Sequence, residues 1–201
     1  MNPQRLANDV LKPWDELNTL LSKRYAFQPD LSDVSRLAGT LAVAIKHQAE
    51  LAGYKDRRGI EAASPDNKLM SDVGDFWKHG PLNDSGRNNS LFVRAIFEYD
   101  PLRGFRFLRN GLVIQHKTLG DHDFMHTSLA AIRYWLAKQH ISLSWPGTVA
   151  EGPAEFYPTA FLHYDPKYCI SMSSTRFQFL ARSKCGQLVP TEPPEVRIEI
   201  Y

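Results

Sequence analysis

The sequence predicts an α+β fold in which a helical part is followed by a strand-rich part. Apolar residues recur at helical spacing over about residues 1–80, and from Leu91 they recur at every second position, as in a half-buried strand. We expect the helices to pack on a mainly antiparallel sheet that carries one further helix. A chain of 201 residues fits one domain, residues 1–201, with its strand-rich part at about 90–201.

The helical part is expected to hold two long helices and one short helix. The first contains Pro13, which lacks an amide hydrogen and therefore predicts a kink or a late start. The second carries one apolar stripe over residues 34–49, has Ser32 or Asp33 as a capping residue, and ends before Gly53.

Turn and charge signals fill residues 54–67, which predicts an exposed connection. The short helix is expected from about Leu69. It should stop at Gly80-Pro81, because glycine tolerates a positive φ and proline cannot continue a helix.

The strand-rich part should begin at Leu91. Asn110-Gly111 predicts a tight hairpin turn between strands at 105–109 and 112–117, because this pair readily adopts the type I′ turn. Helical spacing returns at 123–140. Four further strands are expected at 159–164, 168–173, 175–183 and 195–201.

Composition excludes several classes of protein. The 24 basic and 22 acidic residues nearly cancel, so net charge does not indicate a dedicated nucleic-acid binder. A membrane-spanning run of about 18 apolar residues and a secretory leader are both missing, which predicts a cytoplasmic protein without a membrane partner. Two cysteines, Cys169 and Cys185, are expected to be buried free thiols, and a disulfide between them is the alternative. No Gly-rich nucleotide loop or cofactor motif is present.

Asp72, Asp75 and His79 form the first candidate catalytic group. A helical repeat places Asp75 one turn from His79 and Asp72 on nearly the same side. A carboxylate beside an imidazole orients the ring and raises its basicity, as acid–base catalysis requires. The alternative is structural, because acids early in a helix and Lys78-His79 at its end are what the helix dipole favours.

Arg133 and His140 form the second candidate catalytic group. They lie two turns apart on one predicted helix, so the guanidinium could hold a phosphate while the imidazole moves a proton. This spacing resembles the Arg-x(4–6)-His element of HEPN-type ribonucleases, although Tyr134 stands where that motif has Asn, Asp or His. Arg109 and His116 match the letters better but fall on the predicted hairpin.

Two histidines lie four apart in the segment Asp121-His122-Asp123-Phe124-Met125-His126. On one helical face they could hold a metal ion, but no third ligand is identifiable, and we predict no metal site. The alternative is that Asp121 or Asp123 caps the following helix.

A basic strand face is the candidate nucleic-acid site. Alternation in residues 175–184 places its cations on one face and its phenylalanines on the other, and the preceding hairpin adds further arginines. The alternative is a solvated outer face of the sheet. The predicted contacts are Arg106, Arg109, Arg176, Arg182 and Lys184.

Segments 72–79, 87–89, 105–110 and 123–124 resemble a group of uncharacterised bacterial proteins in which a helix ends in an acid-spaced Lys-His before a strand-rich half. Similar helix ends occur in HEPN-like proteins of phage-defence loci. The resemblance implies a bacterial defence or toxin–antitoxin setting and no particular chemistry.

Two functions follow as hypotheses. The first is a non-catalytic accessory or binding protein that contacts a protein partner, a second copy of itself or nucleic acid through its strand-rich half. The second is a HEPN-like, metal-independent ribonuclease that uses Arg133 with His140, or Asp75 with His79. We prefer the first, because no catalytic set is complete.

Overall fold

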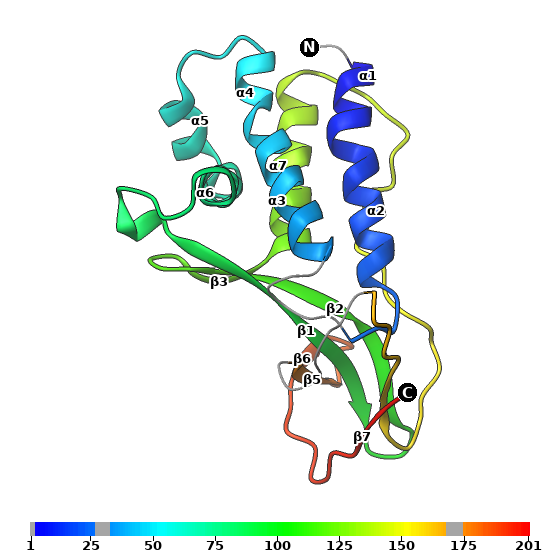
Figure 1. Ribbon diagram of the computed structural model, residues 1–201. Coiled ribbons are helices and arrows are strands. Elements are labelled where there is room, and N and C mark those ends of the chain that lie inside the picture. The colour runs from blue at the N-terminus through cyan, green and yellow to red at the C-terminus, as the bar shows by residue number, and fades with distance from the viewer. Residues whose placement is uncertain (1–2, 27–32, 168–174) are drawn as a thin grey trace.

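The computed structural model describes residues 3–26, 33–167 and 175–201. Its helices gather on one side of a curled sheet, so the predicted α+β class is confirmed (Figure 1). In chain order the helical elements are α1 (Pro3–Leu6), the π-helical η1 (Ala7–Leu11), α2 (Lys12–Leu21), α3 (Asp33–Lys46), α4 (Gln48–Leu51), α5 (Arg57–Ala63), α6 (Pro65–His79), the 3₁₀ turn η2 (Ser85–Arg87) and α7 (Phe124–Lys138).

The larger sheet has the strand order β3-β2-β1-β5-β6. Its pairs are antiparallel except β1 with β5, which run parallel. A separate parallel pair joins β4 to β7. The strands are β1 (Asn89–Asp100), β2 (Gly104–His116), β3 (Gly120–Asp123), β4 (Ala160–Leu162), β5 (Arg176–Arg182), β6 (Leu188–Pro190) and β7 (Ile198–Ile200).

The helical part follows the predicted order but not the predicted lengths. The late start considered for Pro13 is wrong, because helical structure begins at Pro3; the chain passes through the π-helical η1 directly into α2, which has this proline in its first turn. The exposed connection predicted at 54–67 instead contains α5. The third helix starts at Pro65 behind the side-chain cap of Ser64, so it is longer than predicted.

Helices α3 and α6 approach each other closely at two glycines. A Cβ atom on Gly74 would lie 3.2 Å from the backbone of α3, and a Cβ on Gly39 would lie only 2.1 Å from the Trp77 ring. A larger residue at Gly74 would press on the backbone of α3, and one at Gly39 would displace the Trp77 ring. This packing fixes α6, and with it Asp72, over the start of β1.

The predicted turn at Asn110-Gly111 is wrong. Both residues lie inside β2, opposite Ala95 and Arg94, and the chain reverses at residues 101–103 instead. The reason is tertiary: the Asn110 side chain is buried and donates to the carbonyl of Lys23, just beyond the end of α2. A buried amide that satisfies a helix end outweighs the local preference for a turn.

A β-bulge interrupts the pairing of β1 with β2. Ile96 is paired with Arg109 and Phe97 with Phe107, so Leu108 is an extra residue without a partner on β1. Successive side chains of a regular strand point to opposite faces, but a bulge re-aims them. Leu108 and Arg109 consequently line the same cavity.

Two apolar cores follow from this arrangement. The first lies between the helices and the helix-facing ends of β1 and β2. The second lies where the long hairpin extends away from the helices toward β7 (Figure 1). Its buried members are Ala26, Ala95, Phe97, Phe105, Phe107, Ala160 and Leu162.

A long segment without regular structure, residues 139–159, connects α7 to β4. Asn18 of α2 anchors it, because its side-chain amide donates to the Thr148 carbonyl at 2.9 Å and its oxygen accepts from the Ala150 amide at 2.9 Å. The Trp145 indole donates to Asp15 of the same helix. The segment is therefore held firmly enough for Val149 and Glu151 to serve as part of a cavity wall.

The cysteines and one of the predicted strands remain to be compared with the structure. Cys185 is exposed and not buried as expected, because it lies in the turn between β5 and β6. Cys169 and the strand predicted at 168–173 lie outside the described residues. Among the residues described, no helix combines the length and the apolar character needed to cross a bilayer.

Candidate functional site

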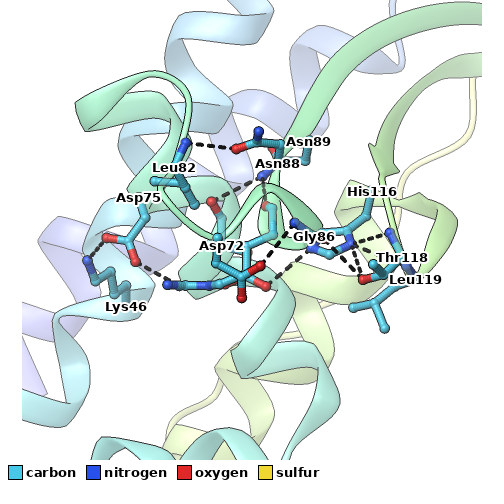
Figure 2. A network of polar contacts seen from close by, with 12 residues as sticks. Lys46, Asp72, Asp75, Leu82, Gly86, Asn88, Asn89, His116, Thr118 and Leu119 are labelled. Atoms are coloured by element: carbon cyan, nitrogen blue, oxygen red, sulfur yellow. Dashed lines mark hydrogen bonds and ion pairs between the residues drawn. The ribbon is translucent and has the colours of Figure 1, made fainter.

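The predicted acids of α6 meet a set of polar residues that we call the Asp72 cluster: Lys46, Asp72, Asp75, Arg87 and His116. Figure 2 shows Lys46 of α3, the two acids of α6 and His116 at the end of β2 converging, and Arg87 of the η2 turn binds both acids. Asp72 and Asp75 lie about one helical turn apart, so both carboxylates face the same neighbours.

Asp72 lies at the centre of the cluster, and its side chain is 1% exposed. One carboxylate oxygen accepts from Arg87 Nε at 2.6 Å, and the other contacts His116 Nε2 at 3.2 Å. Asn89 binds the backbone carbonyl of the same residue at 3.1 Å. A buried carboxylate with a partner on each oxygen is stable in the fold but cannot reach a substrate.

His116 is fixed in one tautomer by its surroundings. Its Nδ1 atom lies 3.3 Å from the Thr118 amide and 3.2 Å from the Leu119 amide, and both of these groups can only donate. Nδ1 is therefore the acceptor, and the hydrogen is on Nε2, where it points to Asp72. Both ring nitrogens are used, so this imidazole is not available as a catalytic base.

The charges of the cluster cancel. Asp75 binds Lys46 through one oxygen and Arg87 Nη2 at 3.0 Å through the other, so two acids face two bases. The bonds to both acids outweigh the desolvation that opposes charge on Arg87, and they raise the pKa of its guanidinium. The arrangement ties α6 to the ends of the two long strands, which indicates a structural role.

His79 does not join the group in which it was predicted. Its side chain is exposed at the end of α6, whereas the Asp75 carboxylate is turned toward Lys46 and Arg87. The pairing of Asp75 with His79 is therefore not assembled. The position of Lys78 and His79 in the last turn agrees with the helix-dipole alternative.

Arg133 and His140 do not share a helix face. Helix α7 ends at Lys138, and His140 lies beyond it with a left-handed φ of 52°. The prediction of one helix over 123–140 is wrong at this end, because the C-cap geometry at Gln139 breaks the repeat. Arg133 donates to the Gly147 carbonyl at 2.9 Å and so helps to hold the long connection.

The predicted basic strand face is largely neutralised by acids of the same chain. Glu98 of β1 binds Arg182 at 2.9 Å and Arg106 at 3.3 Å, and Arg106 also binds Glu151 at 2.9 Å. Arg176 lies over the Phe92 ring, with its guanidinium carbon 4.2 Å from the ring centroid.

These contacts leave less charge for a phosphate backbone than the sequence suggested. Burial alone would raise the pKa of Glu98, but the bonds and charges of Arg182 and Arg106 hold it below its usual value. Arg109 is buried against Asp123, while Lys184 is exposed. Nucleic-acid binding through this face stays a prediction.

A cavity of about 260 Å³ lies beside the bulge, and we call it the Arg109 cavity. Aliphatic side chains from β1, β2, β5, β6 and the long connection form most of its wall, and four polar residues join them. Such a cavity, mainly apolar with a few polar groups that converge, is typical of small-molecule sites. Its lining comprises Ile96, Leu108, Arg109, Asp123, His126, Val149, Glu151, Leu180 and Leu188.

Three of the polar residues form a connected group. Arg109 Nη2 lies 3.1 Å from one oxygen of Asp123, and His126 Nδ1 lies 3.0 Å from the other. The same carboxylate accepts from the His126 amide at 3.0 Å and so caps α7, as the capping alternative predicted. His122 lies in β3 and not on the helix, so the two histidines do not share a helical face.

Arg109 is more buried than the other arginines of the sheet, although Nε of Arg94 likewise lacks a partner among the described residues. Its side chain is only 8% exposed, and its Nη1 atom is buried without an acceptor in the described part of the chain. Burial lowers the pKa of this guanidinium, although Asp123 and Glu151 counteract the shift. A buried donor that lacks an acceptor costs about 1–3 kcal/mol, and more when it is charged.

Asp123 stays ionised despite its partial burial. Desolvation would raise the pKa of its carboxyl, but hydrogen bonds from His126 and the charge of Arg109 lower it below the usual value. Because an ionised carboxylate has no hydrogen to give, His126 Nδ1 is the donor in their contact.

Sequence reasoning missed several residues of both groups. Lys46 gave no signal, and Arg87 and His116 were noted without any link to Asp72. Their contacts join positions far apart in the chain, which periodicity does not detect. For the cavity, the one usable signal was the capping pattern at Asp123.

Groups of three or more potential metal ligands are not found within residues 3–26, 33–167 and 175–201. Comparison of the chain with protein-family models, with curated proteins and with solved structures gave no match.

Proposed function

We propose that this chain is a non-catalytic, intracellular binding protein whose strand-rich half holds a small ligand in the Arg109 cavity. The observation that carries the proposal is the cavity itself. It combines an aliphatic wall with a buried guanidinium whose hydrogen-bonding capacity is incompletely used. An accessory role in a bacterial defence or toxin–antitoxin setting, beside a protein partner or a second copy, is part of the proposal and rests on the resemblance alone.

Two observations favour binding over catalysis. The acids of the Asp72 cluster already have structural partners on their oxygens, and Arg133 donates to a backbone carbonyl.

Three of the five cations predicted to bind nucleic acid have carboxylate partners. A neutralised basic face attracts phosphate weakly, so a small ligand is the better candidate.

A thermal-shift screen of small aliphatic compounds tests the proposal. Leu188→Trp places a large ring in the cavity wall from the short edge strand β6, while Val189→Trp adds the same ring at the adjacent position, which is 41% exposed and outside the lining. We expect compounds that raise the melting temperature of the wild type and of Val189→Trp but not of Leu188→Trp.

The proposal is wrong if no compound in such a screen distinguishes the two tryptophan variants while both remain folded. A second arm measures RNA and DNA binding by gel shift at low salt. Tight nucleic-acid binding that is lost in Arg176→Ala and Lys184→Ala, and is unaffected by Leu188→Trp, would show that the protein acts through the basic face and not through the cavity.

A further inference from the structure

We infer that the ligand of the Arg109 cavity is an aliphatic molecule whose head presents a carbonyl or carboxylate oxygen to the free Nη1 group of Arg109. The inference rests on the proposed function, because it names the chemical class of the ligand for the same site. It follows from which polar atoms of the cavity wall already have hydrogen-bond partners and which lack one.

The wall determines the body of the ligand. Five of its side chains are aliphatic, and the rings of the second apolar core lie outside the lining. A wall of this kind gains free energy by burying alkyl carbon, at about 0.8 kcal/mol for each CH₂ group. Among the described residues, this wall has no Phe, Tyr or Trp ring on which a nucleobase would stack.

The polar end determines the head. Arg109 uses Nη2 for Asp123 and Nε for a long contact, 3.4 Å, to the Asn110 carbonyl, which leaves Nη1. Nη1 is itself buried, so the guanidinium must turn toward the cavity to meet a ligand. A guanidinium has five N–H donors and no acceptor. A ligand group that pairs with Nη1 must therefore supply an acceptor, such as an oxygen with a free lone pair.

The carboxylates of the cavity do not offer an equivalent place for a cation. Both oxygens of Asp123 already accept hydrogen bonds, from Arg109 and from His126. Glu151 binds Arg106, and its side chain is half exposed to water. The buried polar atom of the cavity wall that lacks a partner within the described residues is thus a donor, so an ammonium head would find less there than an acceptor head.

The bulge explains why the site exists at this point of the sheet. In a regular strand, two consecutive residues such as Leu108 and Arg109 would point to opposite faces of the sheet. The bulge brings the apolar wall and the guanidinium to one side, as bulges near binding sites often do.

A titration with three matched compounds tests the inference. Hexanoate, hexanamide and hexylamine each have six carbon atoms in one unbranched chain and differ in the group at its first carbon, and their dissociation constants are measured by ¹H–¹⁵N chemical-shift changes. We expect hexanoate and hexanamide to bind at least about tenfold more tightly than hexylamine, since one hydrogen bond to a charged group has that effect. Comparison of hexanoate with hexanamide shows whether the preferred head is a carboxylate or a neutral carbonyl.

The controls separate this inference from the proposed function. In the double variant Arg109→Met with Asp123→Asn, which removes both charges together, the head-group preference should disappear while weak alkyl binding remains. If hexylamine binds as tightly as the others and Leu188→Trp blocks all three, the cavity is a binding site and the inferred head is wrong. If none binds in a way that Leu188→Trp blocks, both the inference and the proposed function fail.

Discussion

Two regions of this molecule contain the same three residue types in opposite arrangements. In the Asp72 cluster the Asp72 and His116 side chains are each 1% exposed, and Arg87 reaches the surface. Beside the Arg109 cavity the arginine is buried and His126 is 69% exposed. The first group uses its oxygens and ring nitrogens fully, whereas the second keeps an unpaired donor.

This difference teaches that residue type does not identify a functional site. An Asp–His–Arg group can join secondary-structure elements or it can line a pocket, and only the partners of each polar atom and the space beside it separate the two cases. The predictions below test that separation, beginning with the largest effect.

Asp72→Asn should have the largest effect on stability. It removes the charge between Arg87 and His116 in a buried site, and breaking such a pair from one side costs about 3 kcal/mol. Urea unfolding measures the loss, with the exposed Asp121→Asn as the control. A loss below about 1 kcal/mol would show that the cluster is not a structural tie.

Arg109→Met should lower the free energy of unfolding less, by about 2 kcal/mol, because Asp123 is partly exposed and keeps its capping bonds to α7. Adding Asp123→Asn should recover part of this loss, which a double-mutant cycle in urea unfolding measures. Strictly additive losses would mean that the two side chains are not coupled.

Acid should weaken the Asp123 contacts in a defined pH range. The pKa of this carboxyl is lower in the folded protein than the unfolded value of about 3.9. Its contribution to stability is therefore complete above the unfolded value and is lost as the pH falls through the folded one. Asp123→Asn should flatten the decline of stability below about pH 4, measured by thermal unfolding against pH; an unchanged slope would contradict the cause assigned to the shift.

His79→Ala and His140→Asn should have the smallest effects. Both side chains are exposed, and asparagine tolerates the left-handed backbone of His140. We expect stability changes within about 0.5 kcal/mol and no change in expression toxicity or RNA cleavage. If either variant abolishes RNA cleavage that the wild type performs, the ribonuclease hypothesis replaces the proposed function.

Local signals predicted much of the fold. The helix stop at Gly80, the change of period near Leu91 and the strand at 175–183 all depend on neighbours in sequence, and the structure has each of them. The π-helical geometry just before Pro13 is equally local, because a missing amide hydrogen acts within one turn, although the helix starts earlier, at Pro3.

Long-range contacts account for the errors. Asn110 lies in a strand because its amide satisfies a carbonyl at the end of α2, and no window around residue 110 contains that carbonyl. The Asp72 cluster was half predicted, since Asp72 and Asp75 were recognised while their partners lie on other elements. The cavity could not be predicted, because it depends on a bulge and on a side chain from β6.

The parallel pairing of β1 with β5 has a consequence for the order of folding. Antiparallel neighbours such as β1 and β2 meet across a short turn, but β5 must return past α7 and the long connection before it can pair. Contacts of such sequence separation form slowly, and until then one edge of β1 is open to other chains. Because β5 and β6 also supply Leu180 and Leu188, a ligand in the cavity would bind only the completed sheet and would protect it from aggregation.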